Sequence, residues 1–137
     1  MHKARILIVE DEGVHVLALE SMLSESGHFV MDPVATGEDA IAAVRNEQPD
    51  LVLINIGLAG EMDGITAAGH IQSISDIPIL YMCGHFDEDL LKRAGMPRPY
   101  RCLIKPVSAR ELKVCLEMAL RQHALEKLQK NEKDRET

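Results

Sequence analysis

The chain has 137 residues, a length that suits one folded domain with a short extension. Its formal net charge of −7 argues against direct binding to nucleic acid, because such binding needs a basic surface that neutralises phosphates. Aromatic residues make up only 3% of the chain, so stacking on bases is not expected either. No apolar run approaches the length of a membrane span, and the first apolar run is too short for a secretion signal. We therefore expect a cytoplasmic protein that binds neither membrane nor nucleic acid.

Cysteine usage indicates the redox environment. Cys83, Cys102 and Cys115 are odd in number and lack the paired spacing of a metal site. Free thiols in a reducing compartment are the default expectation for such a set. Because free cysteine is mostly buried and inert, core packing of these side chains is favoured over the alternative of redox sensing.

Apolar runs alternate with helical patterns along the chain, as is typical of a parallel sheet covered by helices on both faces. The run Ile6–Val9 is continuously apolar, which predicts a fully buried strand. Pro33 lies inside the second run and has no N–H, so that strand is expected at an edge of the sheet. The predicted strands cover residues 6–9, 29–34, 51–54, 77–82 and 102–104.

Helices are predicted between these strands from apolar residues at helical spacing. The first helix is expected to stop near Gly27. Thr36 is expected to cap the second helix, which ends before Pro49. Asp63 and Gly64 are expected to form a turn before the third helix. The inward-facing residues predicted for the first helix are Val14, Leu17, Ala18, Met22 and Leu23.

A short fourth helix is predicted over residues 87–94, and the last helix begins at a capping box formed by Ser108 and Glu111. No residue breaks this helix before the end of the chain, although its second half is charged and mixed. Residues 1–120 are therefore expected to form the folded domain and residues 121–137 a helical extension. The extension is either a frayed, solvent-exposed tail or a coiled-coil linker.

Five strands and five helices in alternation predict an α/β fold with a doubly wound, five-stranded parallel sheet of flavodoxin-like order 2-1-3-4-5. Ligands of such sheets bind at the carboxyl ends of the strands beside the switch point, here the first and third strands. The first strand is followed by Glu10 and Asp11, and the third by Asn55. The fourth strand ends at Cys83 and the last at Lys105, so all five side chains are expected at one edge.

This constellation resembles the receiver domain of two-component response regulators over residues 4–120. The acidic pair, an Asp-Gly step and the Lys-Pro pair keep the order and spacing of that family. The resemblance implies a (βα)5 fold in which Glu10 and Asp11 bind Mg²⁺, with the carbonyl of Gly57 as a backbone ligand. It also implies that Lys105 pairs with the acids and then with the phosphoryl group.

Asn55 stands where the family carries its phosphate-accepting aspartate. An amide is too weak a nucleophile to form an acyl phosphate, so the resemblance implies a pseudo-receiver, a regulatory interaction module that is not an enzyme. Mg²⁺ is expected to bind weakly, because one charged ligand is missing. The alternative is an ordinary Mg²⁺-dependent phosphoacceptor receiver in which the aspartate at position 55 has been replaced by engineering.

Two further positions depart from the family. Cys83 stands where receivers usually have a threonine or serine whose hydroxyl bonds the phosphoryl group, and a thiol is a weak donor. Cys102 stands where they usually have an aromatic switch residue. Because these changes accompany Asn55, natural divergence is favoured over an engineered substitution.

The resemblance also implies partners. Residues 87–94 and the last helix are similar to receivers fused to PAS and histidine-kinase modules, so the chain is expected to be a fragment of a larger protein. A histidine kinase or another signalling domain is the expected partner. In the family, the face formed by the fourth helix, last strand and last helix also makes homodimers.

A flavin-binding protein of flavodoxin type is a third alternative, but the acids after the first strand would repel a cofactor phosphate. Since the loop also lacks a phosphate cradle, neither flavin nor nucleotide is expected.

Overall fold

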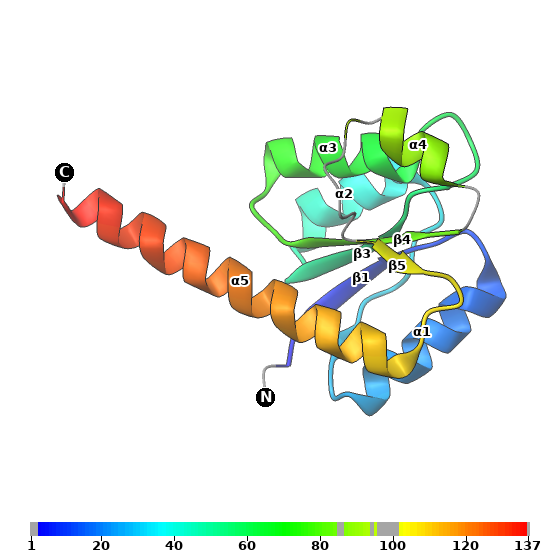
Figure 1. The fold of residues 1–137 in the computed structure, drawn as a ribbon, viewed down its shortest axis with the longest axis horizontal. Coiled ribbons are helices and arrows are strands. Elements are labelled where there is room, and N and C mark those ends of the chain that lie inside the picture. Colours follow the sequence, from blue (N-terminus) through cyan, green and yellow to red (C-terminus); the bar gives the residue numbers. More distant parts are fainter. Residues whose placement is uncertain (1–2, 85–86, 94, 96–101, 137) are drawn as a thin grey trace.

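The computed structural model of the chain describes residues 3–84, 87–93, 95 and 102–136. Its five-stranded parallel sheet has the order β2-β1-β3-β4-β5, which confirms the predicted fold class and topology (Figure 1). The strands are β1 (Arg5–Val9), β2 (Phe29–Val30), β3 (Leu51–Asn55), β4 (Ile79–Cys83) and β5 (Cys102–Ile104). The helices are α1 (Gly13–Glu25), α2 (Gly37–Glu47), α3 (Gly64–Ile74), α4 (Glu88–Arg93) and α5 (Ala109–Glu136).

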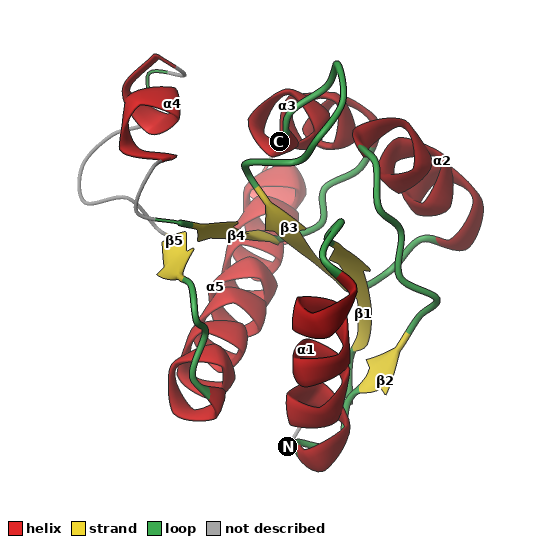
Figure 2. Ribbon diagram, turned by 90° about the vertical axis from the view of Figure 1, so that its right-hand side faces the viewer, coloured by secondary structure: helices red, strands yellow, loops and turns green. Residues whose placement is uncertain are grey.

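The sheet lies between two layers of helices, with α1 and α5 on one face and α2 and α3 on the other (Figure 2). Every residue of β3 is buried, as are the last four residues of β1, which explains their unbroken apolar sequences. The core cluster under α1 and α5 includes Ile6, Ile8 and Leu53. The opposite cluster under α2 and α3 includes Leu7 and Val52. Alternate residues of one strand therefore supply both cores.

The predicted inward face of the first helix is confirmed for Leu23, which is buried, and for Met22, which packs against the core, but it is wrong for Val14, Leu17 and Ala18. Leu19 and Leu23 are the buried residues of α1, whereas Val14 and Leu17 are 85% and 69% exposed and Ala18 is also exposed. The helix carries apolar residues nearly all round, so spacing alone does not single out one stripe. Packing of α1 against the core cluster that it shares with α5 decides which of its residues are buried.

Pro33 shortens β2, which lies at the sheet edge as predicted. Met31 N–H donates to the carbonyl of Ile6 at 3.0 Å, and the alternation of a strand makes Pro33 the next donor toward β1. Proline has no N–H, so Val34 donates to Ile8 in its place, also at 3.0 Å. Regular pairing therefore stops before the end of the predicted strand.

Asp63 and Gly64 were expected to form a turn before the third helix, and in the structure Asp63 is the N-cap residue of α3 and Gly64 its first residue. The carboxylate of Asp63 accepts a hydrogen bond from Thr66 N–H at 2.7 Å. Gly64 lies against the end of β3. A Cβ at this position would lie 2.1 Å from the carbonyl oxygen of Asn55 and 2.6 Å from the Cα of Ile56. Only glycine fits so close to this backbone.

Helix α5 is continuous across the predicted boundary between domain and extension, and it projects well beyond the sheet (Figure 1). The Oγ atom of Ser108 accepts from Glu111 N–H at 3.1 Å, which confirms the serine half of the capping box. Midway along the helix, His123 contacts the main-chain carbonyl of Asp76. The structure describes α5 as helical through Glu136, and the side chains of residues 124–135 are exposed. The solvent-exposed tail and the coiled-coil linker both stay predictions.

Candidate functional site

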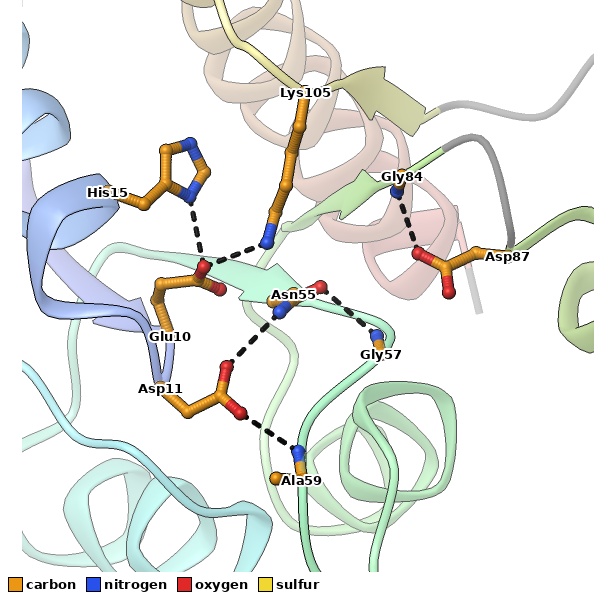
Figure 3. A network of polar contacts seen from close by, with 9 residues as sticks. All are labelled: Glu10, Asp11, His15, Asn55, Gly57, Ala59, Gly84, Asp87 and Lys105. Carbon is orange, nitrogen blue, oxygen red and sulfur yellow. Dashed lines mark hydrogen bonds and ion pairs between the residues drawn. The ribbon is translucent and has the colours of Figure 1, made fainter.

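Glu10 is the buried centre of an ionic network at the carboxyl edge of the sheet (Figure 3). It follows β1 directly, and its Oε1 atom accepts from Lys105 Nζ at 2.8 Å and from His15 Nδ1 at 3.0 Å. Lys105 directly follows β5 and reaches Glu10 from there, and the peptide bond between Lys105 and Pro106 is cis. Within the described part of the chain, Oε2 of Glu10 has no hydrogen-bond partner.

The side chain of Asn55 is 4% exposed and both ends of its amide are engaged. Its Nδ2 atom donates to Asp11 Oδ1 at 3.4 Å, while its Oδ1 atom accepts from Gly57 N–H at 3.1 Å. The other carboxylate oxygen of Asp11 accepts from Ala59 N–H at 3.0 Å. The amide thus joins the acid after β1 to the loop after β3, and it turns its N–H group toward that acid.

The structure bonds the sulfurs of Cys83 and Cys102, so the expectation of three free thiols is wrong for these two residues. They lie on neighbouring strands, β4 and β5, and their Cα atoms are 6.2 Å apart, a span that a disulfide bridges. Cys115 is a free thiol, as predicted. A sequence does not carry the distance between two strands, which is why this pairing was not predictable from spacing.

Glu10, Asp11, Asn55, Gly57 and Lys105 therefore meet at one edge, and the sequence profile of the response regulator receiver domain matches residues 6–117. The chain belongs to the response regulator receiver domain family. It is the receiver domain of a two-component signalling protein.

One relative of known sequence and two solved structures show how much of this chain the similarity to receiver proteins covers. The transcriptional regulatory protein PdtaR of Mycobacterium tuberculosis is 32% identical over 116 residues, which cover 85% of this chain and 56% of PdtaR. The signal receiver domain of a modulated diguanylate cyclase from Desulfovibrio desulfuricans superposes with a TM-score of 0.83 at 30% identity, covering 91% of this chain and 99% of that one.

The N-terminal domain of a response regulator/sensory box/GGDEF three-domain protein from Carboxydothermus hydrogenoformans gives a TM-score of 0.79 at 31% identity. That match covers 89% of this chain and 98% of the solved domain. This receiver thus spans little more than half the length of PdtaR. Among its described residues, no helix is long and apolar enough to cross a membrane.

Two side chains at the receiver site were missed from the sequence. His15, in the first turn of α1, reaches back to Glu10. Asp87, just before α4, accepts from Gly84 N–H at 2.7 Å, and its other oxygen would lie 3.0 Å from a Cβ added at Gly57. The sequence does show that Asp87 is an acid at the start of a helix. It does not show that the carboxylate of Asp87 lies close to Gly57, in the loop after β3.

Replacing Lys105 tests the ionic network of this receiver. Lys105→Met is expected to lower the free energy of unfolding by about 1–2 kcal/mol, because it removes a charged partner from a buried carboxylate that keeps only His15. In Glu10→Gln/Lys105→Met the two losses should not add, because the second change removes the stranded charge. Urea unfolding of the unsubstituted chain, Glu10→Gln, Lys105→Met and Glu10→Gln/Lys105→Met measures this coupling. Lys127→Met, on the exposed part of α5, is the control and should change stability by less than about 0.5 kcal/mol. Additive losses would show that the two groups act independently.

Proposed function

We propose that this receiver domain acts as a pseudo-receiver, a regulatory binding module that works without accepting a phosphoryl group and is not an enzyme. The observation that carries the proposal is Asn55, whose amide is buried and held at both ends between Asp11 and Gly57. An amide oxygen does not attack phosphorus as a carboxylate does, so a stable acyl phosphate has no site on this residue.

Weak Mg²⁺ binding is part of the proposal. The Oε2 atom of Glu10 and the carboxylate of Asp11 are the oxygen ligands that Mg²⁺ favours. Asn55, however, presents an N–H group to Asp11, where a third oxygen would be needed. Within the described residues no three His, Cys, Asp or Glu side chains are grouped so as to hold a metal ion. Glu10 and Asp11 would hold the ion, whose charge would offset that of a phosphoryl group.

A protein partner suits the surface better than nucleic acid does, given the net charge of −7. We propose that the partner is a cytoplasmic histidine kinase or another signalling domain, or a second copy of this chain, bound at the face made by α4, β5 and α5. Support comes from Ile104 on β5 and Met118 on α5, which are exposed apolar side chains on that face. A groove of about 310 Å³ lies between these two elements and is bordered by Leu103 and Met118.

The test is the intact mass of the protein after incubation with acetyl phosphate and Mg²⁺. The chain as it stands should gain no phosphoryl group, whereas Asn55→Asp should gain one if the surrounding pocket is competent. Asp11→Asn added to Asn55→Asp should suppress that gain, because it removes a metal ligand. Phosphorylation of the unsubstituted chain would sink the proposal. If only Asn55→Asp is modified, Asn55 alone silences the pocket, which favours the engineered alternative; if neither is, the pocket has diverged as a whole.

A further inference from the structure

Cys83 and Cys102 are placed on the same face of two paired strands. Cys83 pairs with Ile104 and Tyr81 pairs with Cys102 in the parallel register of β4 and β5. Because side chains alternate between faces along a strand, Cys83 and Cys102 point to one side. With a Cα–Cα distance of 6.2 Å they need no change of fold to form or to break a bond.

This pair lies beneath α4. Cys83 is buried in a small apolar cluster with Ile56 and Leu91, and Leu90 and Cys102 pack against it. Leu91 is the buried residue of α4, so the helix is seated on the cluster that contains the two sulfurs. The two cysteines are 19 positions apart, and the chain between them carries α4. A bond between them therefore closes the loop that bears this helix.

The two sulfurs differ in access. Cys83 is 5% exposed, whereas Cys102 is partly exposed and borders the groove between β5 and α5. Cys115 borders the same groove, but burial, with a further contribution from Glu111, raises the pKa of its thiol. A thiol whose pKa is raised forms less of the reactive thiolate, so Cys115 competes poorly for an oxidant. Because Cys102 is the more accessible of the two, it is expected to react with the oxidant first. Cys83 then reacts with the oxidised Cys102 to form the disulfide.

We propose that Cys83 and Cys102 are a reversible redox modification site, in which a hydroperoxide oxidises the dithiol to a disulfide that fixes α4 on the sheet. The Cys102 thiolate attacks the terminal oxygen of the hydroperoxide, the O–O bond breaks, and Cys102 becomes a sulfenic acid. The rest of the hydroperoxide takes up a proton and leaves as an alcohol, or as water when the oxidant is hydrogen peroxide. The Cys83 thiol then attacks that sulfur, forms the S–S bond and releases water. A small dithiol reverses the step: it is itself oxidised to a disulfide, and both cysteines regain their protons.

The position of the pair links this redox step to the site. The carbonyl of Cys83 accepts from Lys105 N–H at 2.9 Å, and the next residue, Gly84, holds the carboxylate of Asp87. Oxidation would therefore hold the end of β4, the start of α4 and the base of Lys105 together. In a reducing compartment disulfides are ordinarily transient and regulatory, which suits a switch. The switch needs no phosphoryl transfer and so goes beyond the function proposed above.

Thiol trapping tests the chemistry on the full chain. The reduced protein is treated with a stoichiometric amount of hydrogen peroxide. Its remaining free thiols are blocked with N-ethylmaleimide, and the intact mass is measured by mass spectrometry. The expected product carries a single maleimide, on Cys115, and lacks two hydrogens, and dithiothreitol should restore labelling of all three cysteines. Cys115→Ser should form the same link, and Cys102→Ser should not. A link that involves Cys115, a bond between chains, or three thiols that stay reactive would each overturn the proposal.

Hydrogen exchange tests the consequence for α4. In the unsubstituted protein, amides of Glu88–Arg93 should exchange at least tenfold more slowly in the oxidised form than in the reduced form. This comparison needs no substitution, so a variant that folds poorly does not affect it. Cys83→Ala and Cys102→Ala should show the same exchange with and without peroxide. Equal exchange of α4 in the two redox states of the unsubstituted protein would contradict the proposed role.

Discussion

Gly64→Ala is expected to destabilise the receiver by about 3 kcal/mol or more. The added Cβ would lie 2.1 Å from the carbonyl oxygen of Asn55 and 2.6 Å from the Cα of Ile56. Both are backbone atoms, so no side chain can rotate away to make room. Either α3 moves outward or the end of β3 shifts together with Asn55, and both responses loosen the site.

The sign of this effect is informative, because alanine normally stabilises a helix relative to glycine by about 0.5–1 kcal/mol. Gly69 lies in the same helix, and a Cβ added there would meet no atom within 4 Å apart from the neighbouring backbone of α3. Gly69→Ala is therefore the matched control and should be more stable than the unsubstituted protein. Urea unfolding of both variants gives the two free energies. If Gly64→Ala gains stability as Gly69→Ala does, then α3 does not approach β3 as closely as described.

Asn55→Asp is expected to lower the stability of the metal-free protein by about 2–4 kcal/mol. The substitution replaces the N–H donor that lies 3.4 Å from Asp11 Oδ1 with a carboxylate oxygen. Two carboxylates at about 4 Å repel by about 4 kcal/mol at an effective dielectric of 20. The bond from Gly57 N–H to the Oδ1 atom can persist, so the loss comes mainly from charge.

Millimolar Mg²⁺ should recover much of this loss in Asn55→Asp and little in the unsubstituted chain, because a ligand stabilises the state that binds it. Denaturation in EDTA and in Mg²⁺ therefore separates stability from metal affinity, which should move in opposite directions. Asn55→Asp with Asp11→Asn is the control, since it restores an amide beside a single acid. Equal stability of Asn55→Asp and the unsubstituted protein in EDTA would show that Asp11 and residue 55 are farther apart, or better solvated, than described.

The fold was predictable because burial on both faces of a parallel sheet leaves continuous apolar runs such as Leu51–Ile54. The strand ends then located Glu10, Asp11 and Asn55 at one edge, since all carboxyl ends of a parallel sheet lie on the same side. The structure brings these three residues together with Lys105.

Features that depend on three-dimensional distance were not predictable. The inward face of α1 was predicted correctly at Leu23 but not at Leu19, because apolar residues surround that helix and only packing selects the buried ones. The bond between Cys83 and Cys102 depends on the register of β4 against β5, which no local pattern carries. Asp87 was missed because the hydrogen bond that its carboxylate accepts from Gly84 N–H follows from neither helix nor strand periodicity.

Helix α5 gives this small domain mechanical reach. Leu112 and Leu116 root it in the core, His123 ties it to Asp76, and it continues unbroken to its end at Glu136. At 1.5 Å per residue its 28 residues span about 42 Å. Beyond His123, residues 124–136 span about 20 Å, so a tilt of about 5° at His123 would carry the far end through about 2 Å. A continuous helix of this kind enlarges a small change of angle at the sheet into a larger displacement at its far end.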